Sequence, residues 1–238
     1  MTIDIKSNLT TVKNHIHQLA DRYKRQEKSI TLLAVSKTFP AEQIRLAHSA
    51  GQSAFGENYL DEALSKINTL SDLDIEWHYI GPLQSNKTRR IAENFAWVHS
   101  LASLKHAKRL SQQRPESMPP LNVCIQINIS NEDSKSGLDS ADAKTLADDL
   151  QYLPGLCLRG IMGIPARTEN IEEQRKTFAS LASVYRQLQN SHKHIDTLSI
   201  GMSGDMEAAI AEGSTMVRIG TAIFGLRQAT TEKTGNNT

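Results

Sequence analysis

The chain has 238 residues, and its 27 Lys and Arg against 26 Asp and Glu give a formal net charge of +1. Such a balance creates no long-range field that would draw the protein to nucleic acid or anionic lipid, so we expect neither as a partner. The polar, acid-containing N-terminus lacks the apolar core of a signal peptide, and no apolar run approaches the ~20 residues that span a membrane. We therefore expect a cytoplasmic protein.

The N-terminal segment, about residues 1–26, predicts a leading helix. Its apolar side chains recur at alternating steps of four and three residues, which places them on one helix face; they are Ile5, Leu9, Val12, Ile16 and Leu19. At the other end of the chain, the polar residues 230–238 predict a flexible tail.

Short β-rich runs then alternate with helix-like segments. The expected strands cover residues 31–36, 53–58, 76–81, 97–101, 122–128, 157–164, 197–202 and 216–225. The expected helices cover 41–51, 59–70, 86–95, 104–114, 140–153, 172–190 and 205–213. Regular alternation implies parallel strands joined by right-handed crossovers. Eight units favour an α/β fold, a single (β/α)8 TIM-type barrel over residues 1–238 with an additional N-terminal helix, over an open doubly wound sheet.

Cysteines and histidines show no metal-binding pattern. Cys124 and Cys157 lie in apolar runs without CxxC or Cys/His ligand spacing, so we expect buried, reduced thiols. His192 and His194 form a close pair but belong to no metal motif, and no metal site is expected. His78 is expected to be a hydrogen-bonded residue of the core or of a pocket wall.

Lys37 lies where a barrel places its working groups. It follows the apolar run LLAV and Ser36, and Pro40 takes the chain out of strand geometry. In a dry, low-dielectric mouth a lysine tends to lose its proton, and a neutral amine is what attacks an aldehyde. The alternative is an ordinary strand-end lysine whose charge reaches solvent.

Two glycine-containing segments near the C-terminus predict a phosphate site. The run 201–205, Gly-Met-Ser-Gly-Asp, joins a strand to a helix and offers backbone N–H groups and a hydroxyl. The next strand ends at Gly220 and Thr221, and barrel phosphate sites commonly form from the loops after strands seven and eight. Alternatively, Gly201 and Gly220 are turn residues and Ser203 is a helix N-cap.

Several motifs carry a family resemblance: AVSKTFP, FGENYLDEA, EWHYIGPLQSNK, INISNEDSKSG, GIMGIP, LSIGMSGDMEAAI and STMVRIGTAIFG. In this order, from about residue 31 to residue 225, they resemble the pyridoxal 5′-phosphate (PLP) homeostasis protein family. The resemblance implies a barrel similar to the N-terminal domain of bacterial alanine racemase, with PLP bound covalently in its mouth.

The resemblance also implies the binding residues, which are Lys37, Asn58, Met202, Ser203, Arg218, Gly220 and Thr221. Lys37 would form a Schiff base, Ser203, Gly220 and Thr221 would hold the phosphate, and Asn58 would face the phenolic oxygen. Arg218 would donate to the pyridine nitrogen and keep it unprotonated, which makes the ring a weaker electron sink. The alternative for Arg218 is an ion pair with Glu57 or Glu76.

We expect a monomeric, non-catalytic PLP carrier that exchanges PLP transiently with PLP-dependent apoenzymes. The alternative is an amino-acid racemase, which needs two bases. The chain is expected to lack the additional domain that positions one of them in the racemases, and Tyr59 and Tyr79 are loose substitutes. A barrel that binds another phosphorylated metabolite would leave Lys37 unexplained. Lys135 is expected to be a solvated loop charge or a second PLP site.

Overall fold

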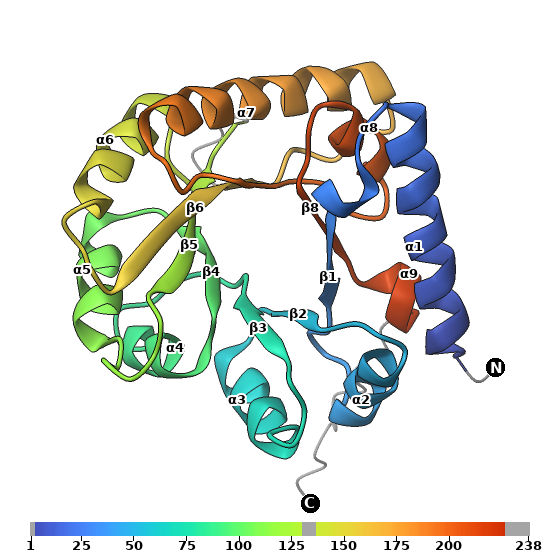
Figure 1. Cartoon of the computed structure of the whole chain (residues 1–238), viewed down its shortest axis with the longest axis horizontal. Coiled ribbons are helices and arrows are strands. Elements are labelled where there is room, and N and C mark those ends of the chain that lie inside the picture. Colours follow the sequence, from blue (N-terminus) through green and yellow to red (C-terminus); the bar gives the residue numbers. More distant parts are fainter. Residues whose placement is uncertain (1–2, 130–136, 227–238) are drawn as a thin grey trace, which may run out of the picture.

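The computed structural model describes residues 3–129 and 137–226, in which parallel strands close into a barrel in the order β1 to β8 (Figure 1). The strands are β1 Thr31–Val35, β2 Ala54–Glu57, β3 Glu76–Tyr79, β4 Trp97–Leu101, β5 Leu121–Ile127, β6 Leu156–Gly163, β7 Thr197–Ser199 and β8 Met216–Ile219. The predicted (β/α)8 barrel is confirmed. Most strands end one to three residues earlier than predicted, so Asn58 and Met202 lie in loops rather than in strands.

Helices form a ring around the barrel (Figure 1). They are α1 Ile5–Arg22, the 3-10 turn η1 Glu27–Ser29, α2 Ala41–Ser49, α3 Leu60–Thr69, α4 Thr88–Asn94, α5 Leu104–Gln113, α6 Ser140–Leu150, α7 Ile171–Ser191, α8 Met206–Ala211 and α9 Thr221–Phe224. The additional helix α1 begins at the Asp4 cap, buries its predicted apolar face and packs against α2, α8 and α9. Within the described ranges, none of the helices has the length and apolar character needed to cross a membrane.

The last predicted strand, 216–225, is wrong in its second half. The strand stops at Ile219, and Gly220 accepts hydrogen bonds from the N–H groups of Ile223 and Phe224, which starts the short helix α9. Phe224 stacks on Phe39 with ring centroids 5.1 Å apart. An apolar run of this length is compatible with either structure, and packing of its end against α1 and Phe39 favours the helical turn.

Side chains inside the barrel alternate with side chains that face the helices, because a closed parallel sheet is buried on both faces. The interior holds two small apolar clusters, one of Leu33, Ala54 and Met216 and one of Trp97, Cys124 and Met162. The expectation for the cysteines is confirmed for Cys124, whose burial raises its pKa to about 12. Cys157 is also a free thiol, but it is only half-buried, so the expectation of burial is wrong for it.

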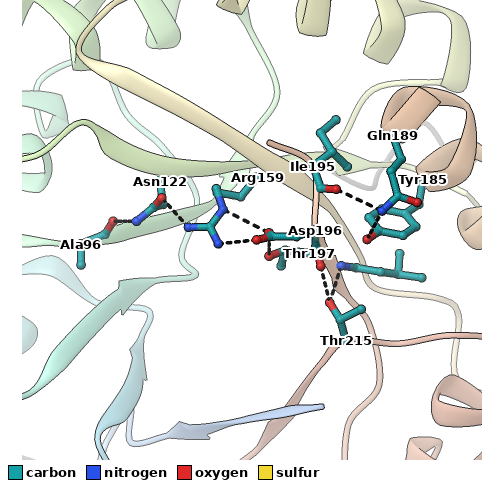
Figure 2. Close-up of polar contacts among 10 residues, drawn as sticks. Ala96, Asn122, Arg159, Tyr185, Gln189, Ile195, Asp196, Thr197 and Thr215 are labelled. Carbon is teal, nitrogen blue, oxygen red and sulfur yellow. Dashed lines mark hydrogen bonds and ion pairs between the residues drawn. The ribbon is translucent and has the colours of Figure 1, made fainter. Parts of the chain in front are cut away.

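A polar network links residues at the N-terminal ends of β5, β6, β7 and β8 (Figure 2). Arg159 donates to Asn122 at 2.9 Å and to both carboxylate oxygens of Asp196, and its guanidinium lies 4.8 Å from the centre of the Trp97 ring. The main-chain carbonyl of Asp196 accepts from Thr215. These contacts join the starts of β5, β6, β7 and β8, so this side of the barrel is held together by structural interactions.

Gly160 lies on β6 where the backbone of Thr197 leaves no room for a side chain, and we predict that Gly160→Ala destabilises the barrel. A Cβ atom there would lie 1.7 Å from the carbonyl oxygen of Thr197, at a register shift between β5 and β6. We expect the free energy of unfolding to fall by about 1–3 kcal/mol, because the backbone must move to relieve the overlap. Urea denaturation should show this fall. The control Gly204→Ala should keep the wild-type free energy of unfolding, because a Cβ atom at Gly204 would enter open space. Equal midpoints for the two variants would contradict the prediction.

Candidate functional site

The predicted binding residues come from four adjacent strands. Lys37 follows β1, Asn58 follows β2, Met202 and Ser203 follow β7, Arg218 lies on β8, and Gly220 and Thr221 follow β8. β7 pairs with β8, β8 with β1, and β1 with β2, all in parallel. Because the carboxyl ends of parallel strands meet at one rim, the structure brings these residues to a single arc of the C-terminal end of the barrel.

The segment around Lys37 is held by an ion cluster of the buried Glu57 and Lys66 and the half-buried Glu62. The Lys66 ammonium donates to Glu57 at 2.8 Å, to Glu62 at 2.5 Å and to the carbonyl of Ser36 at 2.9 Å. Ser36 Oγ donates to Glu57, and the N–H of Thr38 donates to Glu62, each at 2.6 Å. Both chain neighbours of Lys37 are therefore tied to the same cluster.

Sequence reasoning missed this cluster, although a signal was present. Lys66 lies on the face of α3 that also carries the buried Leu60 and Ala63, where an unpaired charge would be costly. Burial raises the pKa of Glu57, while Lys66 and Ser36 act in the opposite direction. Lys66 thus compensates a carboxylate that has no exposure to solvent, and the pair fixes the turn that carries Lys37.

Asn58 lies at the end of β2, where β3 approaches closely. A Cβ atom at Gly81 would lie 2.1 Å from the carbonyl oxygen of Asn58, so only glycine allows the segment after β3 to come this near. The Asn58 side chain is half-buried at the rim. Its contact with a ligand stays a prediction.

The turn after β7 has a different internal structure from the one expected. The N–H of Met202 donates to Asp205 Oδ1 at 2.5 Å, and the N–H of Asp205 donates back to the carbonyl of Met202. Ser203 and Gly204 are exposed at the tip. The N-cap of α8 is Asp205, so the alternative interpretation of Ser203 as the cap is wrong. In this structure Met202 uses its N–H within the turn, and Ser203 presents its side chain to solvent.

The segment after β8 lies beside β1. A Cβ atom at Gly220 would be 3.1 Å from the carbonyl oxygen of Val35, so the ends of β8 and β1 pack tightly here. Thr221 is exposed at the first residue of α9. The exposed hydroxyl-bearing residues Ser203 and Thr221 therefore follow neighbouring strands, as a phosphate site formed after strands seven and eight requires.

Arg218 is a buried cation inside the barrel. Its guanidinium donates to the carbonyl and the hydroxyl of Ser199 and to the carbonyl of Gly163, which are neutral oxygens. The alternative pairing with Glu57 or Glu76 is wrong. Burial lowers the pKa of Arg218 to about 10, with Asp205 acting in the opposite direction, so the side chain stays protonated at neutral pH. A charged donor without a direct carboxylate contact suits a ligand that offers an acceptor or a negative charge.

Two other expectations concern different ligands. Across residues 3–129 and 137–226, no group of three or more His, Cys, Asp or Glu side chains is arranged to hold a metal ion. Lys135, the candidate for a second PLP site, lies outside the described residues, as does the predicted tail 230–238. His78 is fully buried and hydrogen-bonded inside the barrel, as predicted.

Comparison with known proteins identifies the family of this barrel. Residues 7–228 match the family model described as alanine racemase, N-terminal domain. The pyridoxal phosphate homeostasis protein of Escherichia coli K12 is 53% identical over 227 residues, which cover 94% of this chain and 97% of that protein. The protein of the same name from Pseudomonas aeruginosa PAO1 is 52% identical over 223 residues, with 94% and 96% covered.

Solved structures agree with this relationship. PipY of Synechococcus elongatus PCC7942, in a structure with PLP bound, is 37% identical with a TM-score of 0.77, covering 88% of this chain and 99% of that chain. Alanine racemase of Clostridium difficile 630 has a TM-score of 0.75 at 15% identity, with 94% and 58% covered, which shows a shared fold alone. The chain therefore belongs to the pyridoxal phosphate homeostasis protein family, which is built on the barrel of the alanine racemase N-terminal domain.

Proposed function

We propose that this protein binds PLP at the C-terminal end of its barrel and takes part in intracellular PLP homeostasis. The observation that carries the proposal is the pairing of neighbouring strands that brings Lys37 after β1, the buried Arg218 on β8 and the exposed hydroxyl residues after β7 and β8 to one end of the barrel. Relatives about half identical over nearly their whole length carry the corresponding name, and PipY holds PLP in a barrel of the same fold.

The residues present fit the three chemical parts of PLP. The Lys37 amine would hold the aldehyde carbon as a Schiff base, and Ser203, Gly220 and Thr221 would hold the phosphate. Arg218 supplies a permanent donor for the pyridine nitrogen, and Asn58 would hydrogen-bond on the phenolic side. When bound, PLP supplies an electrophilic aldehyde and an electron-withdrawing ring.

The state of Arg218 and the settings of Tyr59 and Tyr79 favour carriage over catalysis. Because Arg218 stays protonated, it can only donate, which keeps the pyridine nitrogen unprotonated and weakens carbanion chemistry. Tyr79 is buried, donates to the carbonyl of Pro82 at 3.2 Å, and has a pKa raised by burial, so it is poorly suited to act as a base. Tyr59 is half-exposed before α3. We therefore propose that the protein is a cytoplasmic monomer that exchanges PLP with apoenzymes and catalyses no reaction of its own.

Lys37 is expected to be the residue that holds PLP covalently. After borohydride reduction of the PLP-loaded protein, mass spectrometry should find the pyridoxyl group on the peptide that contains Lys37. Lys37→Ala should lose this adduct and keep weak, phosphate-dominated binding, because covalent and phosphate contacts contribute separately. Lys144→Ala, at an exposed lysine paired with Asp148, should keep the adduct. A main adduct on Lys135 would place the site elsewhere.

Ser203→Ala and Thr221→Val should each weaken PLP binding by about 1–3 kcal/mol, since a charged phosphate loses one hydrogen bond. Equilibrium titration followed by visible absorption measures the change, and the covalent adduct should still form at saturating PLP. Ser180→Ala is the matched control, because that hydroxyl lies on the exposed side of α7 and donates to the Lys176 carbonyl. Unchanged affinity in both site variants would assign the phosphate to another loop.

Exchange of the α-proton of L- and D-alanine in deuterated water separates a carrier from a racemase. We expect near-background exchange by the PLP-loaded wild type, because Arg218 weakens the electron sink and Tyr79 is held as a donor. The exchange is followed by proton NMR with free PLP as the reference. Rapid exchange of both enantiomers that Lys37→Ala abolishes would replace the carrier with a racemase.

A further inference from the structure

A hydrogen-bonded chain of polar side chains runs through the interior of the barrel, from Arg218 toward the N-terminal end of the strands. Ser199 Oγ lies 2.9 Å from an Arg218 guanidinium nitrogen and 3.0 Å from His99 Nδ1. His99 Nε2 lies 2.9 Å from His78 Nδ1, and His78 Nε2 lies 2.8 Å from Glu76 Oε1. The five residues come from β8, β7, β4 and β3, and Glu76 is the first residue of β3 at the opposite end of the barrel.

The two ends of this chain determine the direction of every hydrogen bond in it. Arginine has only donors and a carboxylate has only acceptors, so Ser199 accepts from Arg218 and Glu76 accepts from His78 Nε2–H. A neutral His78 then accepts at Nδ1 from His99 Nε2–H, and a neutral His99 accepts at Nδ1 from the Ser199 hydroxyl. One arrangement of protons satisfies all four contacts, with both histidines in the Nε2–H form.

Burial and charge favour this neutral arrangement. His78 and His99 have no exposure, and burial lowers the pKa of both. His78 and Arg218 add to the effect on His99, whose pKa lies well below the usual value. Glu76 is about half-exposed, and its hydrogen bond from His78 lowers its pKa, so it stays ionised. A cation at one end, an anion at the other and two neutral rings between them are therefore mutually consistent.

We propose that Ser199, His99, His78 and Glu76 are positioning residues that fix the Arg218 guanidinium through a one-directional hydrogen-bond chain. The chain sets the orientation of Ser199, and Ser199 contacts Arg218 through both its hydroxyl and its carbonyl. The consequence for PLP rests on the proposed function: a fixed, protonated Arg218 presents its donors to the pyridine nitrogen in one geometry. The chain links that nitrogen to a carboxylate at the far end of the barrel.

The first test uses the protein without PLP. Long-range nitrogen-15 NMR of the imidazole rings reports which nitrogen carries the proton, and His78→Gln and His99→Gln assign the two rings. We expect both rings to be neutral and in the Nε2–H form between about pH 6 and 8, which spans the usual histidine pKa. An Nδ1–H form in either ring, or a protonated His99 in this range, would overturn the proposed direction of the chain.

The second test measures the effect on Arg218. With PLP labelled at the pyridine nitrogen, we expect Ser199→Ala to shift the nitrogen-15 resonance and to weaken binding roughly three- to tenfold, the range expected for one lost hydrogen bond. Ser199→Thr keeps a hydroxyl and should restore both values toward the wild type. Asp196→Asn is the control, because it breaks the Arg159 pair at the same end of the barrel as Glu76 and lies outside the chain (Figure 2).

The outcomes separate the two proposals. An unchanged pyridine resonance and affinity in Ser199→Ala, or an equal shift in Asp196→Asn, would contradict the positioning role. Failure of the wild type to bind PLP would contradict the proposed function. The predicted imidazole tautomers would not be affected by that result, because they are measured without PLP. If Ser199→Ala does not fold, the tautomers of the wild type still decide whether the chain has the proposed direction.

Discussion

The pairing of β1 with β8 closes the barrel, and the candidate site depends on this closure. Four residue pairs, from Thr31 with Met216 to Ala34 with Ile219, join the first and last strands in parallel. Because the strands run in the same direction, their carboxyl ends meet at one rim. Lys37 and Arg218, which are far apart in sequence, thereby come from neighbouring strands. Without this pairing, the amine and the buried guanidinium would belong to opposite edges of an open sheet.

Two buried cations near this closure are compensated in different ways. Lys66 contacts two carboxylates, so its charge is balanced within the protein. Lys66 holds Ser36 and its partner Glu62 holds Thr38, so the cluster fixes the residues on both sides of Lys37. Arg218 donates to neutral oxygens of Ser199 and Gly163. The first arrangement is structural, since a lysine among carboxylates has no charge left for a ligand. The second leaves a protonated donor in a dry environment, which suits recognition of an acceptor on a bound molecule.

Alternation of β-rich and helical segments was enough to predict the barrel and the strands that carry the site. The interior contacts were harder to predict, because they depend on which strands face one another across the barrel. His99 and Ser199 give no signal in their own segments. Lys66 lies on the apolar face of α3, but only the placement of α3 against β2 identifies Glu57 as its partner. The error over α9 has a similar cause, since only packing on α1 and Phe39 decides between strand and helix. The roles of the predicted binding residues toward PLP rest on the family resemblance.

The visible absorption spectrum of the purified protein, recorded with added PLP before and after borohydride, tests the central claim most directly. A covalent link at a single lysine predicts a visible band that saturates at one PLP per chain. Borohydride should bleach this band and leave the reduced group attached through denaturation and dialysis. A colourless protein that takes up no PLP would contradict the account.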